Sequence, residues 1–284
     1  MYSSVSLVIF AGCLLAQPAD WIATGNRALD NGSPEEAAAD FEHALEAEVR
    51  AGASAKNLLH LRVTLATAHM EAGAYREMEA VLQEAQKTAV ELTDDLSRAE
   101  LLNAWSALHL KLGKLSAAEA ELREARRMAL QLPEPGDLLP TVLHNLAAIE
   151  MRTGRYADAL RDELAAIRRL EKTLAPDHPV LIRGWASLAS LQYMMGQPQE
   201  AKMSIERALA SADKTYGPTH PLVGDLLESD AVVLDKLKLK REAKRVRARA
   251  RTIRRTEVAA GADRLTWNVR DALAPEGQVY LTSR

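Results

Sequence analysis

Residues 185–208 of this 284-residue chain read WASLASLQYMMGQPQEAKMSIERA. A small residue, Ala189, stands seven positions before Gly196, and alanines follow that glycine five and twelve positions later. The frame recurs along the chain, because such a glycine returns at intervals of 41, 40, 41 and 42 residues. Self-similarity at a fixed period predicts an array of stacked structural repeats. The recurring glycines are Gly32, Gly73, Gly113, Gly154 and Gly196.

The periodicity within a repeat is helical. Before Gly154, the apolar residues Val142, Leu143, Leu146 and Ile149 recur at intervals of three and four, as on one face of a helix. Glycine then ends that helix, because it adopts a left-handed backbone conformation without steric cost. Composition agrees, since aromatic residues make up only 4% of the chain and β-branched runs are scarce. The sequence therefore predicts an all-α protein.

Two segments resemble the tetratricopeptide repeat, in which paired helices pack closely where side chains are small. They carry the pattern W-x2-[TL]-[GA] followed by A-x3-[FI]-x2-A, and begin at Trp21 and Trp185. Two connections, Leu174–Pro179 and Tyr216–Pro221, share the signature P-x-H-P and lie 42 residues apart. This repeat length and connection are similar to the kinesin light chain type of tetratricopeptide array, which also occurs in bacterial proteins.

The resemblance implies an α-solenoid, a right-handed superhelix of about six helix-turn-helix repeats. Lys238 takes the place of the glycine in the sixth copy. Residues 256–284 depart from the pattern and are expected to form a capping tail, with Trp267 covering the end of the array. The repeats are expected near 18–51, 59–92, 99–132, 140–173, 182–215 and 224–255.

The N-terminus carries an apolar run from Val5 to Ala16, which has the length of a signal-peptide core. Residues 1–17 are therefore interpreted as a signal peptide, and the protein as periplasmic or secreted. Cys13 ends the sequence Phe10-Ala11-Gly12-Cys13, which is similar to a bacterial lipoprotein box, so lipidation there is an alternative and the only membrane contact expected. An uncleaved N-terminus in a cytoplasmic protein is a third reading.

No catalytic pattern is found in the sequence. The seven histidines form no metal-binding motif, and H-E-x-x-H, C-x2-C, G-x-S-x-G and a glycine-rich phosphate loop are all missing. His69 and His109 share a repeat position that normally packs between the paired helices. We therefore expect no enzyme activity, no metal ligand and no cofactor.

The resemblance implies binding of a peptide or a partner's helix in a concave groove lined by the first helix of every repeat. Repeats three to five offer Lys111, Arg152 and Arg183 there, which suits a ligand that carries carboxylates. We expect a protein or peptide partner, with an acidic one in view, and a monomeric protein. The candidate groove residues are Asn26, His60, Thr67, Asn103, Lys111, His144, Asn145, Arg152, Arg183, Ser187 and Tyr193.

The charges are unevenly distributed along the chain. The segment from Lys236 to Arg255 holds eleven bases and one acid, Glu242. It is read either as the solvated face of a final amphipathic helix or as a surface for an anionic partner. Nucleic acid is not expected, because no aromatic residues are interleaved. Two functions stay open: an exported scaffold of the bacterial envelope, and an intracellular regulatory module that binds a signalling protein through the groove or the basic helix.

Overall fold

The computed structural model of the protein describes residues 17–90, 92, 94–133, 135–136 and 138–259. Three expectations fall on the other residues: the apolar core of the signal peptide, the lipoprotein box at Cys13, and the capping tail with Trp267. They lie outside the described residues and stay predictions.

In its described part the chain forms twelve α-helices and no strand, which confirms the predicted all-α class. It divides into two compact units, Met1–Thr93 and Asp94–Arg284. Unit one holds α1 (Pro18–Asp30), α2 (Pro34–Ala51), α3 (Ala55–Glu71) and α4 (Tyr75–Ala89). Unit two holds α5 (Asp95–Lys111), α6 (Leu115–Ala129), α7 (Leu138–Arg152), α8 (Tyr156–Thr173), α9 (Pro179–Met194), α10 (Pro198–Tyr216), α11 (Pro221–Lys236) and α12 (Lys240–Ala259).

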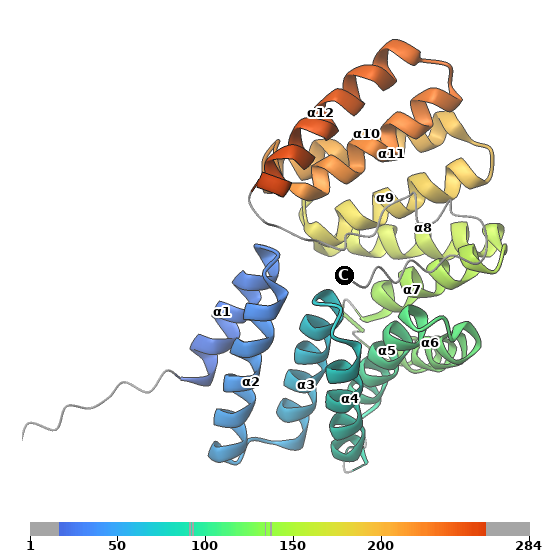
Figure 1. Ribbon diagram of the computed structural model, residues 1–284. Coiled ribbons are helices and arrows are strands. Elements are labelled where there is room, and N and C mark those ends of the chain that lie inside the picture. The colour runs from blue at the N-terminus through green and yellow to red at the C-terminus, as the bar shows by residue number, and fades with distance from the viewer. Residues whose placement is uncertain (1–16, 91, 93, 134, 137, 260–284) are drawn as a thin grey trace, which may run out of the picture. The chain divides into compact units, whose positions relative to one another are not determined.

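The helices pack as consecutive pairs (Figure 1). Each odd-numbered helix packs most extensively against the even-numbered helix that follows it. Within unit one α2 then contacts α3, and within unit two α6 contacts α7, α8 contacts α9, and α10 contacts α11. Within each unit, a pair therefore buries its apolar faces between its own two helices and against the neighbouring pair, as in an array of repeats.

The turns inside the pairs are left-handed, as the recurring glycines predict. Gly32, Gly113 and Gly196 have φ values of 69°, 73° and 75°. Lys238, which replaces the glycine in the sixth pair, adopts the same turn with φ of 63°, a region that residues with a side chain rarely adopt. The sixth copy therefore keeps its turn between α11 and α12 although the glycine is lost.

Small side chains allow the two helices of a pair to approach. Ala66, Ser106 and Ala147, each seven positions before a turn glycine, are fully buried. In the first pair the same position is Gly25, and a Cβ atom there would lie only 2.7 Å from Cε1 of Phe41. Phe41 is itself fully buried, so the bulk of its ring requires the glycine that faces it.

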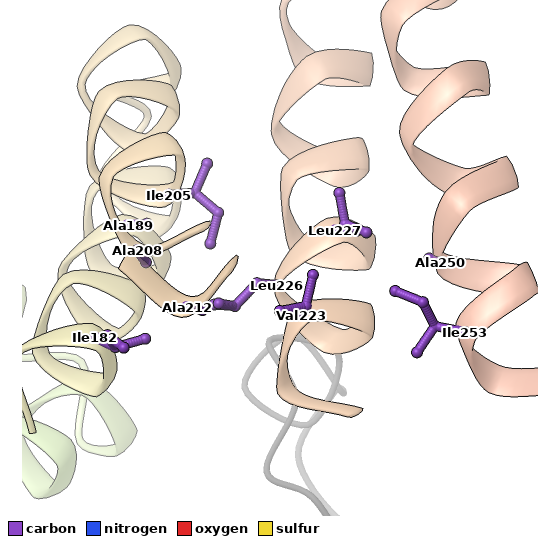
Figure 2. Close-up of a cluster of buried hydrophobic side chains, with 10 residues drawn as sticks. All are labelled: Ile182, Ala189, Ile205, Ala208, Ala212, Val223, Leu226, Leu227, Ala250 and Ile253. Atoms are coloured by element: carbon purple, nitrogen blue, oxygen red, sulfur yellow. The ribbon is translucent and has the colours of Figure 1, made fainter. Parts of the chain in front are cut away.

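The core of unit two is made of aliphatic side chains (Figure 2). Ile182 of α9, Ile205 of α10 and Val223 of α11 have no exposed surface, and Ile253 of α12 closes the cluster. Alanines of α9, α10 and α12 complete the cluster, and Ala250 of the last helix is 1% exposed. The apolar side of the basic helix α12 is therefore buried and its charged side faces outward.

The P-x-H-P connections lead directly into α9 and α11, whose first residues are Pro179 and Pro221. His178 and His220 cap α9 and α11, since the Nδ1 atom of each accepts a hydrogen bond from the backbone N–H two residues on, at 3.3 and 3.2 Å. The connection before α9 is also held from α10, where the Thr215 hydroxyl donates to the Asp177 carbonyl at 2.6 Å. The recurring histidines thus have a structural role at helix starts.

Candidate functional site

The first helices of successive pairs meet in unit two. Helix α7 contacts both α5 and α9, and α9 also contacts α11. The side-chain amide of Asn145 on α7 donates a hydrogen bond to Oδ1 of Asn103 on α5, at 2.8 Å. Two residues predicted to line one groove are thus in direct contact across neighbouring first helices. We call the surface that carries Asn103, Lys111, His144, Asn145, Arg152 and Arg183 the first-helix face.

Basic side chains lie along this first-helix face. Arg152 ends α7, and its guanidinium donates to the carbonyl of Leu110 near the end of α5, at 3.0 Å. Lys111, the next residue of α5, is exposed, as are Arg152 and Arg183. One N–H of Arg152 is used within the protein, and four others remain in its planar fork. Arg152 can therefore support the packing of α5 with α7 and still donate to a ligand.

The eleven predicted residues differ in accessibility. Asn26, His60 and Thr67 are exposed in unit one, where the Thr67 hydroxyl donates to the Val63 carbonyl of its own helix at 3.1 Å. Tyr193 on α9 is partly buried. Ser187 is 4% exposed, which makes it the least accessible of the eleven. A role for these side chains in binding stays a prediction.

One residue of the site was missed from the sequence. Glu163 on α8 lies beneath His144, whose Nδ1 atom is 3.0 Å from both carboxylate oxygens. The side chain of Glu163 is 1% exposed and that of His144 is 36% exposed. The sequence did hold a signal, because Glu163 stands four residues after Ala159, where the repeat frame places Phe41 and Ile205.

A second position of interest lies four residues before the turn glycine, and it is polar in the second to fifth pairs. His109 contacts Glu121 at 2.9 Å, and the Ser204 hydroxyl donates to Oε1 of Gln192 at 2.7 Å. The predicted packing of His109 between the helices of its pair is therefore confirmed, whereas His69 is 7% exposed and its ring lies 3.8 Å from Glu42 of α2, in the preceding pair. In the contacts of His109 and Gln192 the second residue comes twelve positions after the first.

In the fourth pair that position brings two acids together. Glu150 is 7% exposed and Asp162 is 2% exposed. Burial raises the pKa of Glu150 from 4.5 to about 7, and the negative charges of Asp162 and Asp158 add to this effect. Oε2 of Glu150 has no hydrogen-bond partner among the described residues. The fold therefore favours a neutral Glu150.

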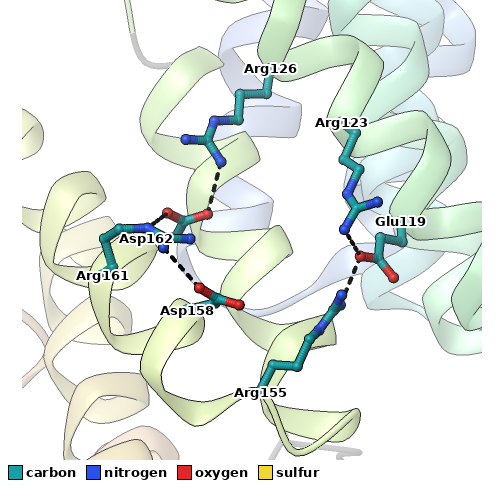
Figure 3. A network of polar contacts seen from close by, with 7 residues as sticks. All are labelled: Glu119, Arg123, Arg126, Arg155, Asp158, Arg161 and Asp162. Carbon is teal, nitrogen blue, oxygen red and sulfur yellow. Dashed lines mark hydrogen bonds and ion pairs between the residues drawn. The ribbon is translucent and has the colours of Figure 1, made fainter.

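The second acid is neutralised by a network of arginines that joins α6 to α8 (Figure 3). Asp162 contacts Arg126 of α6 at 3.1 Å and Arg161 at 3.2 Å, and Arg161 also contacts Asp158 at 2.8 Å. A neighbouring carboxylate, Glu119 of α6, contacts Arg123 at 2.6 Å and Arg155 at 2.7 Å. These pairs fix how the second helices of the third and fourth repeats pack.

Some of the basic residues of α12 form ion pairs with acidic residues of the same chain. Arg247 pairs with Asp235, Arg249 contacts Asp213 of α10 at 2.5 Å, and Arg254 lies 4.0 Å from Asp225 of α11. A further set of its basic side chains is exposed to solvent: Arg241, Lys244, Arg251 and Arg255. The outward side of α12 is therefore a cationic surface.

The surface of unit one is hollowed between α2 and α3. A depression of about 450 Å³ is lined mainly by apolar atoms of Leu45 and Val49, with Glu46, Arg50 and Arg62 around them. Val49 is 52% exposed. None of these lining residues is among the eleven groove residues predicted from the sequence.

The described residues contain no group of three or more His, Cys, Asp or Glu side chains that could hold a metal ion. No helix among those described is long and apolar enough to cross a membrane.

Comparisons with known proteins agree with this geometry. Residues 138–214 match the family model described as tetratricopeptide repeat. None of the curated proteins matches the sequence. The fold is similar to that of BtubC (BKLC) from P. vanneervenii, with a TM-score of 0.62, 19% identity, and 88% of this chain and 95% of that chain covered.

Two further structures have the same fold. A putative kinesin light chain with nearly identical TPR-like repeats from Podosopora anserina has a TM-score of 0.56 and 21% identity, with 70% of this chain and 96% of that chain covered. A Rap protein complexed with competence and sporulation factor has a TM-score of 0.63 and 14% identity, with 85% of this chain and 76% of that chain covered. At such identities the likeness shows the fold alone.

The fold and the site have the architecture of helical-repeat proteins, in which the first helices of successive repeats form one surface. Within that class, residues 138–214 match the tetratricopeptide-repeat model, and the structural neighbours of the chain include kinesin light chain-like repeats.

Proposed function

We propose that the protein is a non-catalytic scaffold that binds an extended peptide or a partner's helix on the first-helix face of α5, α7 and α9. The observation that carries this proposal is the Asn103–Asn145 hydrogen bond at 2.8 Å, which joins two adjacent first helices beside exposed basic side chains. Amide and guanidinium groups arranged in this way can hold the backbone and the carboxylates of one ligand. The Rap neighbour, which is complexed with competence and sporulation factor, adds support by analogy of fold.

The partner is expected to be acidic, and the protein to act as a monomer. Export to the bacterial envelope, as a periplasmic or secreted protein, rests on the apolar run from Val5 to Ala16. Mass spectrometry of the N-terminus from native cells tests it, because an intact Met1 on cytoplasmic protein would contradict export. Lipidation at Cys13 would appear as a mass increase on the same peptide.

The test of binding uses the partner that co-purifies from native cells. Replacing Arg152 and Arg183 together by alanine should weaken that partner about tenfold or more, because a hydrogen bond to a charged group contributes about 1.5–3 kcal/mol and each 1.4 kcal/mol is a factor of ten. The matched control replaces Lys244 and Arg251, which are exposed on α12. That control should change the association rate and its salt dependence more than the lifetime of the complex.

The cationic surface of α12 supports a second candidate. Seven of its basic residues are exposed, so an anionic signalling protein could dock there, with the protein inside the cell. Calorimetry separates the two: unchanged affinity of the Arg152/Arg183 variant, together with loss of binding by the Lys244/Arg251 variant, would place the partner on α12 and refute the first-helix face.

A further inference from the structure

Glu163 places a carboxylate where the first, second, third and fifth repeats have a large apolar side chain. The position is the ninth residue after the turn glycine, on the inner side of each second helix. Glu163 is 0% exposed, like its apolar counterparts. Those counterparts are Phe41, Leu82, Leu122 and Ile205.

A carboxylate at such a position needs a compensating charge. Taking an ion out of water costs several kcal/mol unless it is paired with good geometry. His144 supplies the pair, since its Nδ1 atom lies 3.0 Å from both oxygens of Glu163. The backbone of α9 also comes close, because a Cβ atom at Gly184 would lie 3.6 Å from Oε1 of Glu163. The buried carboxylate therefore lies directly behind the first-helix face.

The charged groups that act on His144 come from two neighbouring helices. Glu163 of α8 raises the pKa of His144, by charge and by hydrogen bonding, while burial and the positive charge of Arg183 on α9 lower it, with a net rise. From α5, the first-helix face contributes the neutral amide of Asn103, which is bonded to Asn145. His144 is thus the group of this face whose charge changes nearest to neutral pH.

We infer that His144, charged through its contact with Glu163, is a proton-linked cation of the first-helix face and helps Arg183 to bind the carboxylates of an acidic peptide. This inference rests on the proposed function, for which it names the chemistry of the ligand and a control by pH. When His144 loses its proton, the negative charge of Glu163 is no longer balanced. The face then becomes more negative by one charge, and an acidic ligand is repelled.

The chain offers a matched control for this pair. His109 contacts Glu121 at 2.9 Å, and the two side chains are 18% and 20% exposed. This pair has the same chemistry, but it lies between α5 and α6, away from Asn145 and Arg183. A change that acts through any buried histidine would affect both pairs, whereas the inference concerns His144 alone.

The experiment uses the full chain and acetylated hexaglutamate amide as the probe. Each imidazole NMR signal reports the protonation of a single histidine, and the His144→Gln variant identifies the signal of His144 among the seven histidines. Hexaglutamate is titrated between pH 5.5 and 8.5 at constant ionic strength, where its side chains stay ionised. Because arginine and lysine keep their charge over this range, binding to α12 would show no titration and would leave the His144 signal unmoved.

We expect hexaglutamate to shift the His144 signal and to bind more weakly as the pH rises, with the midpoint at the titration of His144 itself. The loss should be about fivefold, as for one partly exposed charge. His144→Gln should bind about fivefold more weakly at pH 6 and show no such midpoint. His144→Lys should stay tight across the range, and Glu163→Gln should move the midpoint to lower pH. His109→Gln should behave as the parent protein.

Three results would overturn the inference: a neutral His144 at pH 6, the same pH dependence in His144→Gln as in the parent, or no effect of hexaglutamate on the His144 signal at any pH. Either His144→Gln or His144→Lys can assign the His144 signal, so the NMR titration of the parent protein decides even where one of these variants fails to fold. Failure of the proposed function looks different. In that case the native partner would ignore the Arg152/Arg183 change while hexaglutamate still followed the titration of His144.

Discussion

Replacing Glu150 by glutamine should stabilise the fourth repeat at alkaline pH. The pKa of Glu150 is raised from 4.5 to about 7, so the folded state binds more protons than the unfolded state between these values. Its stability therefore falls as the pH rises from about 4.5 to 7 and stays low above that range. Each pH unit is worth about 1.4 kcal/mol, so the full cost is about 3 kcal/mol at pH 8.5 and close to zero near pH 4.5.

The shape of the site suits this replacement. Gln192 occupies the same repeat position in the fifth pair, where its Oε1 accepts a hydrogen bond from Ser204 at 2.7 Å. A glutamine can therefore lie between two helices at this point without new strain. Since the amide carries no charge, the Glu150→Gln variant should exceed the parent in stability by about 1–3 kcal/mol at pH 8.5, and the difference should vanish toward pH 5.

Amide hydrogen exchange of α7, followed by mass spectrometry, is the suitable assay because a repeat array can unfold in segments. The difference between variant and parent is measured at several pH values from 5 to 8.5, so that contributions from other groups cancel. Glu200→Gln, at an exposed acid in the first turn of α10, is the control and should leave the pH profile unchanged. A difference that is constant with pH would refute the reasoning, since a desolvated carboxyl must titrate.

Two further changes test the packing of the helix pairs. Gly25→Ala should destabilise unit one by about 1–3 kcal/mol in urea unfolding, because the added methyl would lie 2.7 Å from Phe41, and Phe41→Leu in the same chain should recover most of the loss; a neutral Gly25→Ala would show that the pair can spread at no cost. His144→Leu should cost about 3–5 kcal/mol at pH 6, because it leaves the buried carboxylate of Glu163 unpaired, whereas Glu163→Leu should cost less, since the remaining histidine is 36% exposed; equal losses would contradict this asymmetry.

Most of the fold follows from the sequence because every repeat obeys the same local rules. The packing of two helices is determined by a turn glycine, a small residue seven positions before it and alanines after it. The structure confirms the helix pairs. The left-handed turn at Lys238 was not evident, since nothing in its side chain favours φ of 63°. Packing of Leu234 and Ala243 on either side imposes that turn, because both are buried.

The candidate site was harder to predict because repeat positions state which way a side chain points but not what it contacts. Asn145 was identified as a groove residue, yet its hydrogen bond to Asn103 depends on how far α5 and α7 are offset. The role of Arg249 and Arg254 as helix-bridging residues was hidden for the same reason, since their acidic partners lie on α10 and α11. Glu163 was missed because the repeat motif identifies residues that match its pattern, and Glu163 does not match it.

Several residues that depart from the repeat pattern lie in the fourth repeat, and their titration changes the stability of the fold in the same direction. Asp162 and Glu163 are adjacent buried acids on α8, one held by arginines and the other by His144, while the charge of Asp162 acts on Glu150 of α7. The raised pKa of His144 means that its pair with Glu163 stabilises the fold fully below the ordinary histidine pKa of 6.5, and that this contribution is lost as the pH rises through the higher pKa of the folded state. The raised pKa of Glu150 also disfavours the fold as the pH rises toward 7. Because a repeat contacts only its neighbours, rising pH should destabilise the fourth repeat and its packing against the adjacent repeats. An acidic ligand that prefers charged His144 would oppose this destabilisation.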